Sequence, residues 1–426
     1  MKPLIYCTII LLTIIGCSPV RRISRDLRTQ PTYTDHFTGV ALYDPATGRR
    51  LIQHNADQPF IPASNTKLFS FYAGLLTLPD SLPVLKYVVR NDSLIFWGTG
   101  NPLLLHPVLS DTTALAFLRN RPERLFFSAA NYTGPRFGPD WAWNDYNDDY
   151  SAELAPLPLY GNVVRFTGER ISPGRFRDSV RTATDASTDV RRSEFSNAFT
   201  RPADVKALRQ DVPFRWSAEL AAQLLADTLR RPVGLVNQTM PLTARLLRGW
   251  PADSLYKRML QVSDNQFAEQ VLFMVSAERG GAPTGSGRLE PVAELRRLSN
   301  EVLRFPAGSA RWVDGSGLSR HNLFTPNVLI DLLAKITVKV SRARLFALLP
   351  AAGQSGTLRS VLPANEAPYV WAKSGSMTSV YNLSGYLLTR RNKLLYFSIM
   401  HNNFTQPVSE MRGRTAELLK RLHEQL

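Results

Sequence analysis

Residues 37–78 read FTGVALYDPATGRRLIQHNADQPFIPASNTKLFSFYAGLLTL. The stretch opens with two strand-like runs, at 40–43 and 51–54, and the segment between them carries Pro and Gly at turn positions. This pattern predicts a β-hairpin. From Ser64 onward the apolar residues cover most of a helix circumference, which is typical of a helix buried inside a domain. A hairpin leading into a buried helix indicates the start of a mixed α/β domain.

The pattern changes twice beyond this stretch. From 84 to 235, short strand-like runs alternate with clusters of Gly, Pro, Asn and Asp, which predicts a β-rich segment with many turns and one helix, at 217–231. From 236 onward helices return, followed by a hairpin within 382–403 and a last amphipathic helix at 407–425. We therefore expect a mixed α/β domain whose antiparallel sheet is formed by both chain ends and packed with helices. Its two parts, 36–83 and 236–426, are interrupted by an inserted β-rich domain at 84–235.

The first segment indicates the compartment. MKPLIYCTIILLTIIGC has one Lys and then about a dozen apolar residues, which is short for a transmembrane helix and typical of a secretory signal. The ending IIGC resembles the lipobox of bacterial lipoproteins, in which cleavage leaves a lipidated Cys at the N-terminus. A plain signal peptide cut nearby and an uncleaved anchor are the alternatives. We expect a signal peptide at 1–16, lipidation of Cys17, a tether at 17–35, and a place on the periplasmic side of a bacterial cell envelope.

Charge and composition narrow the function. The chain has 426 residues with 51 Lys and Arg against 35 Asp and Glu, a formal net charge of +16. The basic residues are scattered and no nucleic-acid-binding motif accompanies them, so we expect a cationic surface and no nucleic-acid partner. The two cysteines, Cys7 and Cys17, both lie in the signal segment, which excludes cysteine catalysis in the mature domain. The six His form no metal-binding pair, and we expect no metal and no cofactor.

Ser64 and Lys67 form an S-x-x-K pair at the predicted helix start. Positions i and i+3 share one helix face, and a Ser hydroxyl becomes a useful nucleophile when a neighbouring group takes its proton. A Lys amine can do so once burial or a nearby cation lowers its pKa. The pattern alone is weak, because Ser254 and Lys257 repeat it. Either pair could also be two polar residues on a helix turn.

Two further motifs occur once each. Ser263-Asp264-Asn265 offers a hydroxyl to relay a proton to a leaving amine and an amide to bind a substrate carbonyl, although Ser and Asp also favour a helix N-cap. Lys373-Ser374-Gly375-Ser376 falls on a predicted strand. Lys373 and Ser374 could hold a substrate carboxylate while Gly375 lets the substrate backbone approach. The alternative for this motif is the polar end of an edge strand.

In this order, S-x-x-K, S-D-N and K-S-G match the signature set of the active-site-serine penicillin-recognising enzymes. Within that group the chain resembles the low-molecular-mass class C penicillin-binding proteins, the D-alanyl-D-alanine carboxypeptidase/endopeptidase family. Four more stretches carry the resemblance, which runs from about 37 to 425: LIFWGTGNPLLL (94–105), APLPLYGNVVRF (155–166), RWVDGSGLSRHNLFTP (311–326) and LLPAAGQSGTLRS (348–360). The third motif departs from the commoner K-T-G, but Ser keeps the hydroxyl.

The resemblance implies a β-lactamase/transpeptidase-like fold and a serine peptidase that acts on peptidoglycan stem peptides. Ser64 would attack the D-Ala-D-Ala carbonyl with help from Lys67, and Ser263 would pass a proton to the leaving amine beside Lys373. The backbone N–H groups of Ser64 and Ser376 would form the oxyanion hole. β-Lactams would acylate Ser64 as inhibitors. The alternatives are a β-lactamase or esterase on the same fold, and a non-catalytic wall-binding lipoprotein.

Overall fold

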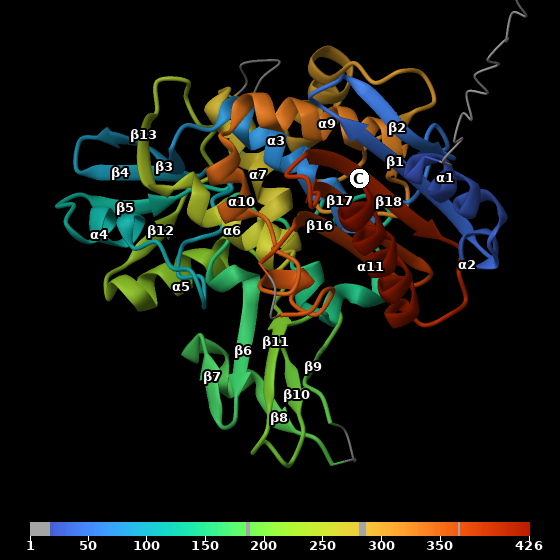
Figure 1. Cartoon of the computed structure of the whole chain (residues 1–426). Helices are drawn as coiled ribbons and strands as arrows, with labels where there is room; N and C mark the ends of the chain where they lie inside the picture. The colour runs from blue at the N-terminus through green and yellow to red at the C-terminus, as the bar shows by residue number, and fades with distance from the viewer. Residues whose placement is uncertain (1–17, 185–187, 281–286, 365–366) are drawn as a thin grey trace, which may run out of the picture.

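Figure 1 shows the computed structural model of the chain, which describes residues 18–184, 188–280, 287–364 and 367–426. The predicted signal peptide at 1–16 and Cys17 lie outside the described residues. Within those ranges, none of the helices combines the length and the apolar character needed to cross a bilayer.

The central element is a five-stranded antiparallel sheet that both chain ends build. Its strands are β1 (Phe37–Asp44), β2 (Arg49–His54), β16 (Val370–Met377), β17 (Val380–Leu388) and β18 (Leu394–Asn402). Their order is β16-β17-β18-β1-β2, so the N-terminal hairpin adds directly to the C-terminal one. The predicted mixed α/β architecture and both predicted hairpins are confirmed.

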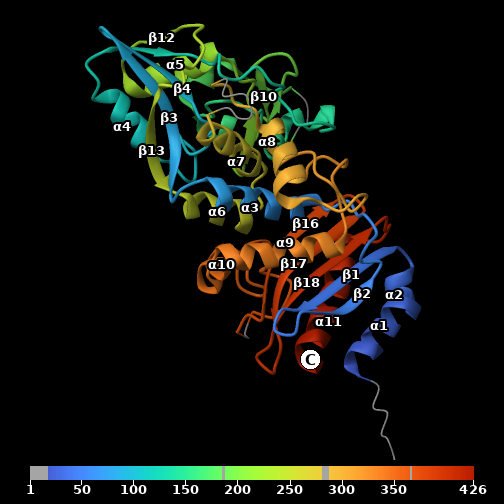
Figure 2. The ribbon, with the colours of Figure 1, turned by 90° about the horizontal axis from the view of Figure 1, so that it is seen from above.

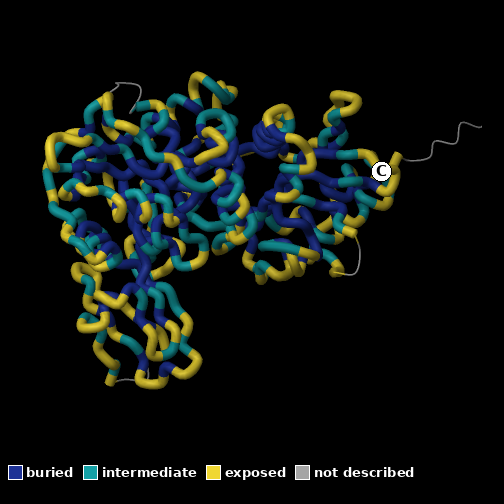
Figure 3. Tube along the Cα trace, turned by 90° about the vertical axis from the view of Figure 1, so that its left-hand side faces the viewer, coloured by how far each residue is buried: buried dark blue, intermediate teal, exposed yellow. Residues whose placement is uncertain are grey.

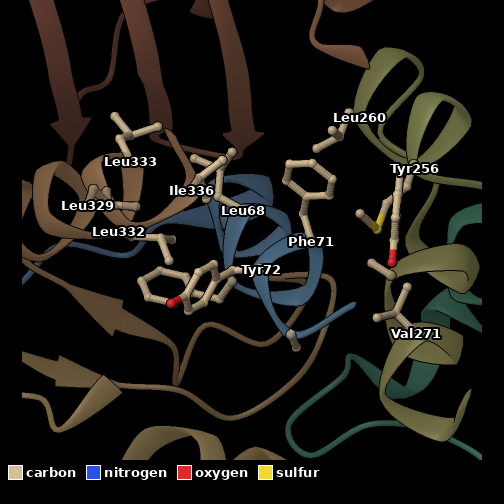
Figure 4. Packing of buried hydrophobic residues seen from close by; sticks show 14 of the residues in the cluster. Leu68, Phe71, Tyr72, Tyr256, Leu260, Val271, Leu329, Leu332, Leu333 and Ile336 are labelled. Carbon is tan, nitrogen blue, oxygen red and sulfur yellow. The ribbon is translucent and has the colours of Figure 1, made fainter. Parts of the chain in front are cut away.

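One face of this sheet is covered by α3 (Lys67–Thr77) and α9 (Pro326–Lys339). Figure 4 shows Phe71 and Tyr72 of α3 between α9 and the pair α6 (Ala252–Gln261) and α7 (Asn265–Glu278). Because α3 has buried side chains on nearly all sides, it forms the centre of the largest core. Each fully buried Phe or Leu side chain contributes roughly 1.5–3 kcal/mol relative to exposure. This packing fixes the start of α3, where Ser64 lies.

The opposite face corrects one expectation, because the tether predicted at 17–35 is largely helical. Residues 19–34 form α1 (Pro19–Thr29) and α2 (Pro31–Thr34). Ile23, Leu27 and Tyr33 are buried in a second core with strands of the sheet and with α11 (Val408–Gln425). The sequence prediction missed these helices because Arg residues surround the apolar positions. Helix propensity and polarity alone do not show which helix face will pack against the sheet.

The segment between α3 and α6 builds a second, mixed five-stranded sheet in the order β12-β5-β4-β3-β13. Its strands are β3 (Ser81–Arg90), β4 (Ser93–Gly98), β5 (Arg124–Phe127), β12 (Val233–Leu235) and β13 (Arg245–Pro251). β13 lies after 235, where helices were expected. Its pairing with β3 shifts register twice, which explains why its sequence lacks a clear alternation. The division into domains at 83/84 and 235/236 stays a prediction.

A projecting lobe holds two small sheets, β11-β6-β7 and β8-β10-β9, and Figures 1 and 3 show it extending from the body with an exposed outer rim. The lobe strands are β6 (Val163–Thr167), β7 (Arg170–Ser172), β8 (Val180–Thr182), β9 (Arg191–Arg192), β10 (Phe199–Arg201) and β11 (Arg209–Pro213). The remaining α-helices are α4 (Thr113–Arg119), α5 (Ala218–Leu229), α8 (Pro291–Arg297) and α10 (Arg342–Leu348). The short helices and last strands are η1 (Ala63–Thr66), η2 (Trp143–Asn147), η3 (Asp149–Ser151), η4 (Tyr160–Asn162), η5 (Gly174–Ser179), η6 (Leu298–Leu303), η7 (Gly356–Leu358), β14 (Ala310–Arg311) and β15 (Leu323–Phe324).

Candidate active site

Ser64 lies in the single turn η1, directly before α3 begins at Lys67. The amine Nζ of Lys67 lies 2.8 Å from Ser64 Oγ. Lys67 is fully buried, while Ser64 is partly open to solvent. Ala63, the residue before Ser64, has a φ of +46°, a conformation that costs a non-Gly residue energy and that occurs often at functional sites. The S-x-x-K pattern at 64–67 thus corresponds to a direct contact between the Ser64 hydroxyl and the Lys67 amine.

Lys67 has two further partners. Its Nζ lies 2.6 Å from Asn265 Oδ1 and 2.7 Å from the carbonyl oxygen of Ser316. Burial lowers the pKa of Lys67 to about 8, although the carboxyls of Asp314 and Glu269 oppose this shift. The amine can therefore lose its proton near neutral pH, as a base for Ser64 must.

The S-D-N motif forms the N-terminus of α7. Asp264 is the N-cap and accepts a hydrogen bond from the backbone N–H of Phe267. Ser263, just before the helix, has a φ of +64°. Asn265 also donates to the carbonyl oxygen of Tyr150 at 2.9 Å, and this second bond orients its Oδ1 toward Lys67. The cap and the site coexist, because Asp264 alone performs the capping.

The K-S-G motif lies on β16, at the edge of the first sheet. Lys373 Nζ lies 2.9 Å from Ser263 Oγ, and Ser374 Oγ donates to Thr357 Oγ1 at 2.7 Å. Burial, and then the charge of Lys67, hold the pKa of Lys373 well below its usual range. Gly375 lies against η1, since a Cβ there would come 2.4 Å from the carbonyl oxygen of Pro62. The structure therefore brings together all three motifs.

A fourth segment, 314–317, was not assigned a role from the sequence. Glu269 of α7 accepts hydrogen bonds from the backbone N–H groups of Gly315 at 2.9 Å and Ser316 at 2.7 Å. Asp314 accepts from the backbone N–H groups of Gly317 and Ser319. Burial raises the pKa of both carboxyls, that of Glu269 to about 8. These contacts hold the Ser316 carbonyl that faces Lys67. The D-G-S-G pattern was the available signal, but its contacts follow only from the fold.

The second S-x-x-K copy behaves differently. Ser254 and Lys257 lie on α6, and Lys257 is exposed to solvent. Lys257 therefore lacks the burial that prepares Lys67 to act as a base. This pair is a helix turn, which was one of the two alternatives for it.

A cavity of about 570 Å³ opens at Ser64. The cavity is lined by residues of the site, by the segment at 140–150, which contains η2, and by the end of β16. The lining residues include Ser64, Asn265, Arg320, Ser376 and Thr378. A substrate molecule can reach the Ser64 hydroxyl through this opening. A serine held against a buried lysine, with a second Ser–Lys pair beside it, is the arrangement of a serine acyl-transfer enzyme.

Comparison with known proteins identifies the family. The sequence model of the D-Ala-D-Ala carboxypeptidase 3 (S13) family matches residues 21–204 and 200–422. The D-alanyl-D-alanine carboxypeptidase DacB of Haemophilus influenzae is 31% identical over 416 residues, covering 87% of this chain and 86% of that protein. The D-alanyl-D-alanine carboxypeptidase of Actinomadura sp. is 27% identical over 441 residues, covering 88% and 80%. The chain belongs to the D-Ala-D-Ala carboxypeptidase 3 (S13) family.

Solved structures support the fold. Penicillin binding protein 4 (dacB) of Haemophilus influenzae has a TM-score of 0.70 at 22% identity, over 91% of this chain and 96% of that one. The same protein in complex with a novel β-lactam has a TM-score of 0.69 at 20% identity, over 94% and 99%. The predicted transpeptidase-like fold and the predicted enzyme class, a D-Ala-D-Ala carboxypeptidase, are confirmed. The family favours this activity over a β-lactamase or a non-catalytic wall-binding protein.

Proposed function

We propose that the chain cleaves D-Ala-D-Ala peptides of peptidoglycan through an acyl-enzyme on Ser64, as a carboxypeptidase and as an endopeptidase. The observation that carries this proposal is the 2.8 Å contact between Ser64 Oγ and the buried amine of Lys67. Ser is activated by a base that can accept its proton, and burial gives Lys67 that ability.

The proposed reaction has two steps. The Lys67 amine takes the proton of Ser64, and Oγ attacks the carbonyl carbon between the two D-Ala residues. The backbone N–H groups of Ser64 and Ser376 stabilise the oxyanion. The C–N bond then breaks, and the leaving D-Ala amine takes a proton through Ser263, beside Lys373. Water attacks the ester carbonyl, which releases the shortened peptide and returns the proton to Ser64.

Ser374, Gly375 and Ser376 are the proposed binding strand for the substrate. Gly375 lets η1 pack directly against β16, because a Cβ there would come 2.4 Å from the carbonyl oxygen of Pro62, and this packing keeps Ser64 next to the strand. The hydroxyl of Ser374, on the same strand, is held by its hydrogen bond to Thr357 Oγ1. A peptide bound along β16 would present its carbonyl to Ser64.

The endopeptidase activity follows from the leaving group. A free terminal D-Ala and a stem peptide joined through its side-chain amine both leave as amines, and an open cavity can admit either one. A β-lactam would acylate Ser64 in the same way, and the related penicillin binding protein 4 is known in complex with one. We place the protein in the cell envelope, anchored by a lipid on Cys17.

Digestion of purified muropeptides tests this proposal. The wild-type enzyme should release D-Ala from pentapeptides and cleave cross-linked dimers. Ser64→Ala should abolish both activities, while Ser254→Ala, which removes the serine of the other S-x-x-K pair, should retain them. Absence of both activities in the wild-type enzyme would contradict the proposal. For the anchor, incorporation of a labelled fatty acid should be lost in Cys17→Ala.

A further inference from the structure

The outer side of α1 carries a row of arginines. Arg21, Arg25 and Arg28 follow at intervals of four and three residues, so they share one helix face, with Arg22 beside them. All four are exposed, whereas Ile23 and Leu27 of the same helix are buried against the sheet. The buried side fixes the orientation of the helix and thereby directs the arginines to solvent. We call these four residues the arginine face.

The charges of the arginine face are largely unneutralised by the protein. In the part of the chain that the structure describes, Arg21, Arg22 and Arg28 form no ion pair, and Arg25 reaches only Asp26, at 3.7 Å. Asp26 is buried and accepts a 2.6 Å hydrogen bond from Arg421, which already compensates its charge. The helix holds no other acidic residue. The arginine face therefore presents several guanidinium groups that are free to bind an anionic partner.

The position of this face leaves the active site accessible. α1 packs beside β2, one edge of the first sheet, whereas Lys373 and Ser374 lie on β16 at the other edge. Four strand spacings separate those edges, about 19 Å. Helix α1 also covers the face of the sheet opposite to α3, as Figure 2 shows from above. A large surface can contact the arginine face without covering the cavity at Ser64.

We propose that the arginine face docks the protein onto an anionic phospholipid bilayer. The α-helix extends about 16 Å at 1.5 Å per residue, so its arginines can contact several headgroups of a planar surface at once. Guanidinium groups bind phosphate in a bidentate manner, and clustered Lys and Arg side chains bind anionic membranes additively. Such docking holds the catalytic cavity away from the lipid and toward the peptidoglycan. It depends on neither the chemistry at Ser64 nor an attached acyl chain.

Co-sedimentation with vesicles tests the arginine face. The protein is the chain from residue 17 with Ser in place of Cys17, which lacks an acyl chain and keeps all the buried apolar residues of the described ranges, the first being Ile23. It should bind vesicles containing about one third phosphatidylglycerol, with little binding to pure phosphatidylcholine. Binding should fall steeply in roughly 0.3 M salt. Replacing all four arginines of the face by Gln should weaken binding by at least about tenfold.

The matched control removes the same charge elsewhere. Arg170, Arg177, Arg181 and Arg209 are exposed residues of the projecting lobe, and their replacement by Gln should leave vesicle binding within about twofold. Equal loss in both variants would show a general cationic attraction and would overturn the proposal, as would unchanged binding in the α1 variant. Preferential binding of an oligonucleotide over the vesicles would also overturn it. Penicillin labelling should be unchanged in both variants, which separates this test from that of the catalytic proposal.

Discussion

Asn265 Oδ1 lies 2.6 Å from Lys67 Nζ, although 198 positions separate the two residues in the chain. A neutral amide at this place accepts a hydrogen bond without adding a charge. Asn265→Asp should place a carboxylate beside the amine, favour its protonated form and raise the pKa of Lys67. The rate of acylation by penicillin at neutral pH should fall by about tenfold for each unit of that rise, and the profile should move to higher pH.

The matched variant is Asn265→Ala, which removes the hydrogen bond without adding a charge. This variant should slow acylation by penicillin without shifting the pH dependence of the acylation rate to higher pH. Identical profiles for the Asp and Ala variants would show that Asn265 does not act through the charge state of Lys67.

The pH dependence of the wild-type enzyme follows from the buried amine. Because burial lowers the pKa of Lys67 to about 8, the base form is the minor form at pH 7 and dominates above pH 8. Acylation should therefore rise with pH, about tenfold per unit below pH 8, and then level off. Lys67→Arg should be inactive at every pH, since a guanidinium does not release its proton. Stopped-flow measurements with a chromogenic β-lactam provide the profile, and a flat profile between about pH 6 and 9 would exclude Lys67 as the base.

Glu269 is expected to position the carbonyl of Ser316. Its carboxyl accepts two backbone hydrogen bonds, from Gly315 and Ser316. Glu269→Gln turns one acceptor into an NH₂ group that faces a backbone N–H, so above about pH 8, where the Glu269 carboxyl is ionised because its pKa is raised to about 8, the free energy of unfolding should fall by about 1–3 kcal/mol. Urea unfolding measures this loss. The rate of acylation by penicillin should fall as well, with a smaller effect on the binding constant of the β-lactam.

Glu219→Gln serves as the comparison for this variant, because Glu219 is an exposed residue in the first turn of α5 and belongs to neither α7 nor the loop at 314–317. Full activity and stability in Glu269→Gln would show that the loop at 314–317 holds its shape without the carboxyl.

Helix α1 should contribute to the stability of the whole domain. Leu27 is fully buried among strands of the sheet and α11, so Leu27→Ala should lower the free energy of unfolding by about 2–5 kcal/mol. Arg21→Ala, on the exposed side of the same helix, should change it by less than about 0.5 kcal/mol. Equal stability of both variants in urea would restore the interpretation of 17–35 as a tether.

The elements of the fold that could be predicted are those with a clear strand or helix pattern in their own sequence. The hairpins β1–β2 and β17–β18 follow from alternation and turn residues, α3 follows from its apolar run, and α11 follows from its amphipathic pattern. Helix α1 was missed because Ile23 and Leu27 stand among arginines, and only the neighbouring sheet makes them core residues. β13 was missed because its register shifts interrupt the alternation.

In the site, too, local motifs could be predicted from the sequence, whereas contacts between distant residues could not. The order of the three motifs predicted the residues, but the contact of Lys373 with Ser263 joins positions 110 apart and depends on the fold. Glu269 is an ordinary helix residue in sequence. It accepts the hydrogen bond from the Ser316 backbone only because the fold places α7 beside the loop at 314–317.

The central claim is that Ser64, and not the serine of the other S-x-x-K pair, forms the acyl-enzyme. Labelling with a fluorescent penicillin, followed by peptide mapping by mass spectrometry, tests it most directly. The wild-type enzyme and Ser254→Ala should carry one adduct on the peptide that contains Ser64, and Ser64→Ala should carry none. Persistent labelling of Ser64→Ala, or an adduct mapped to another peptide, would contradict the account.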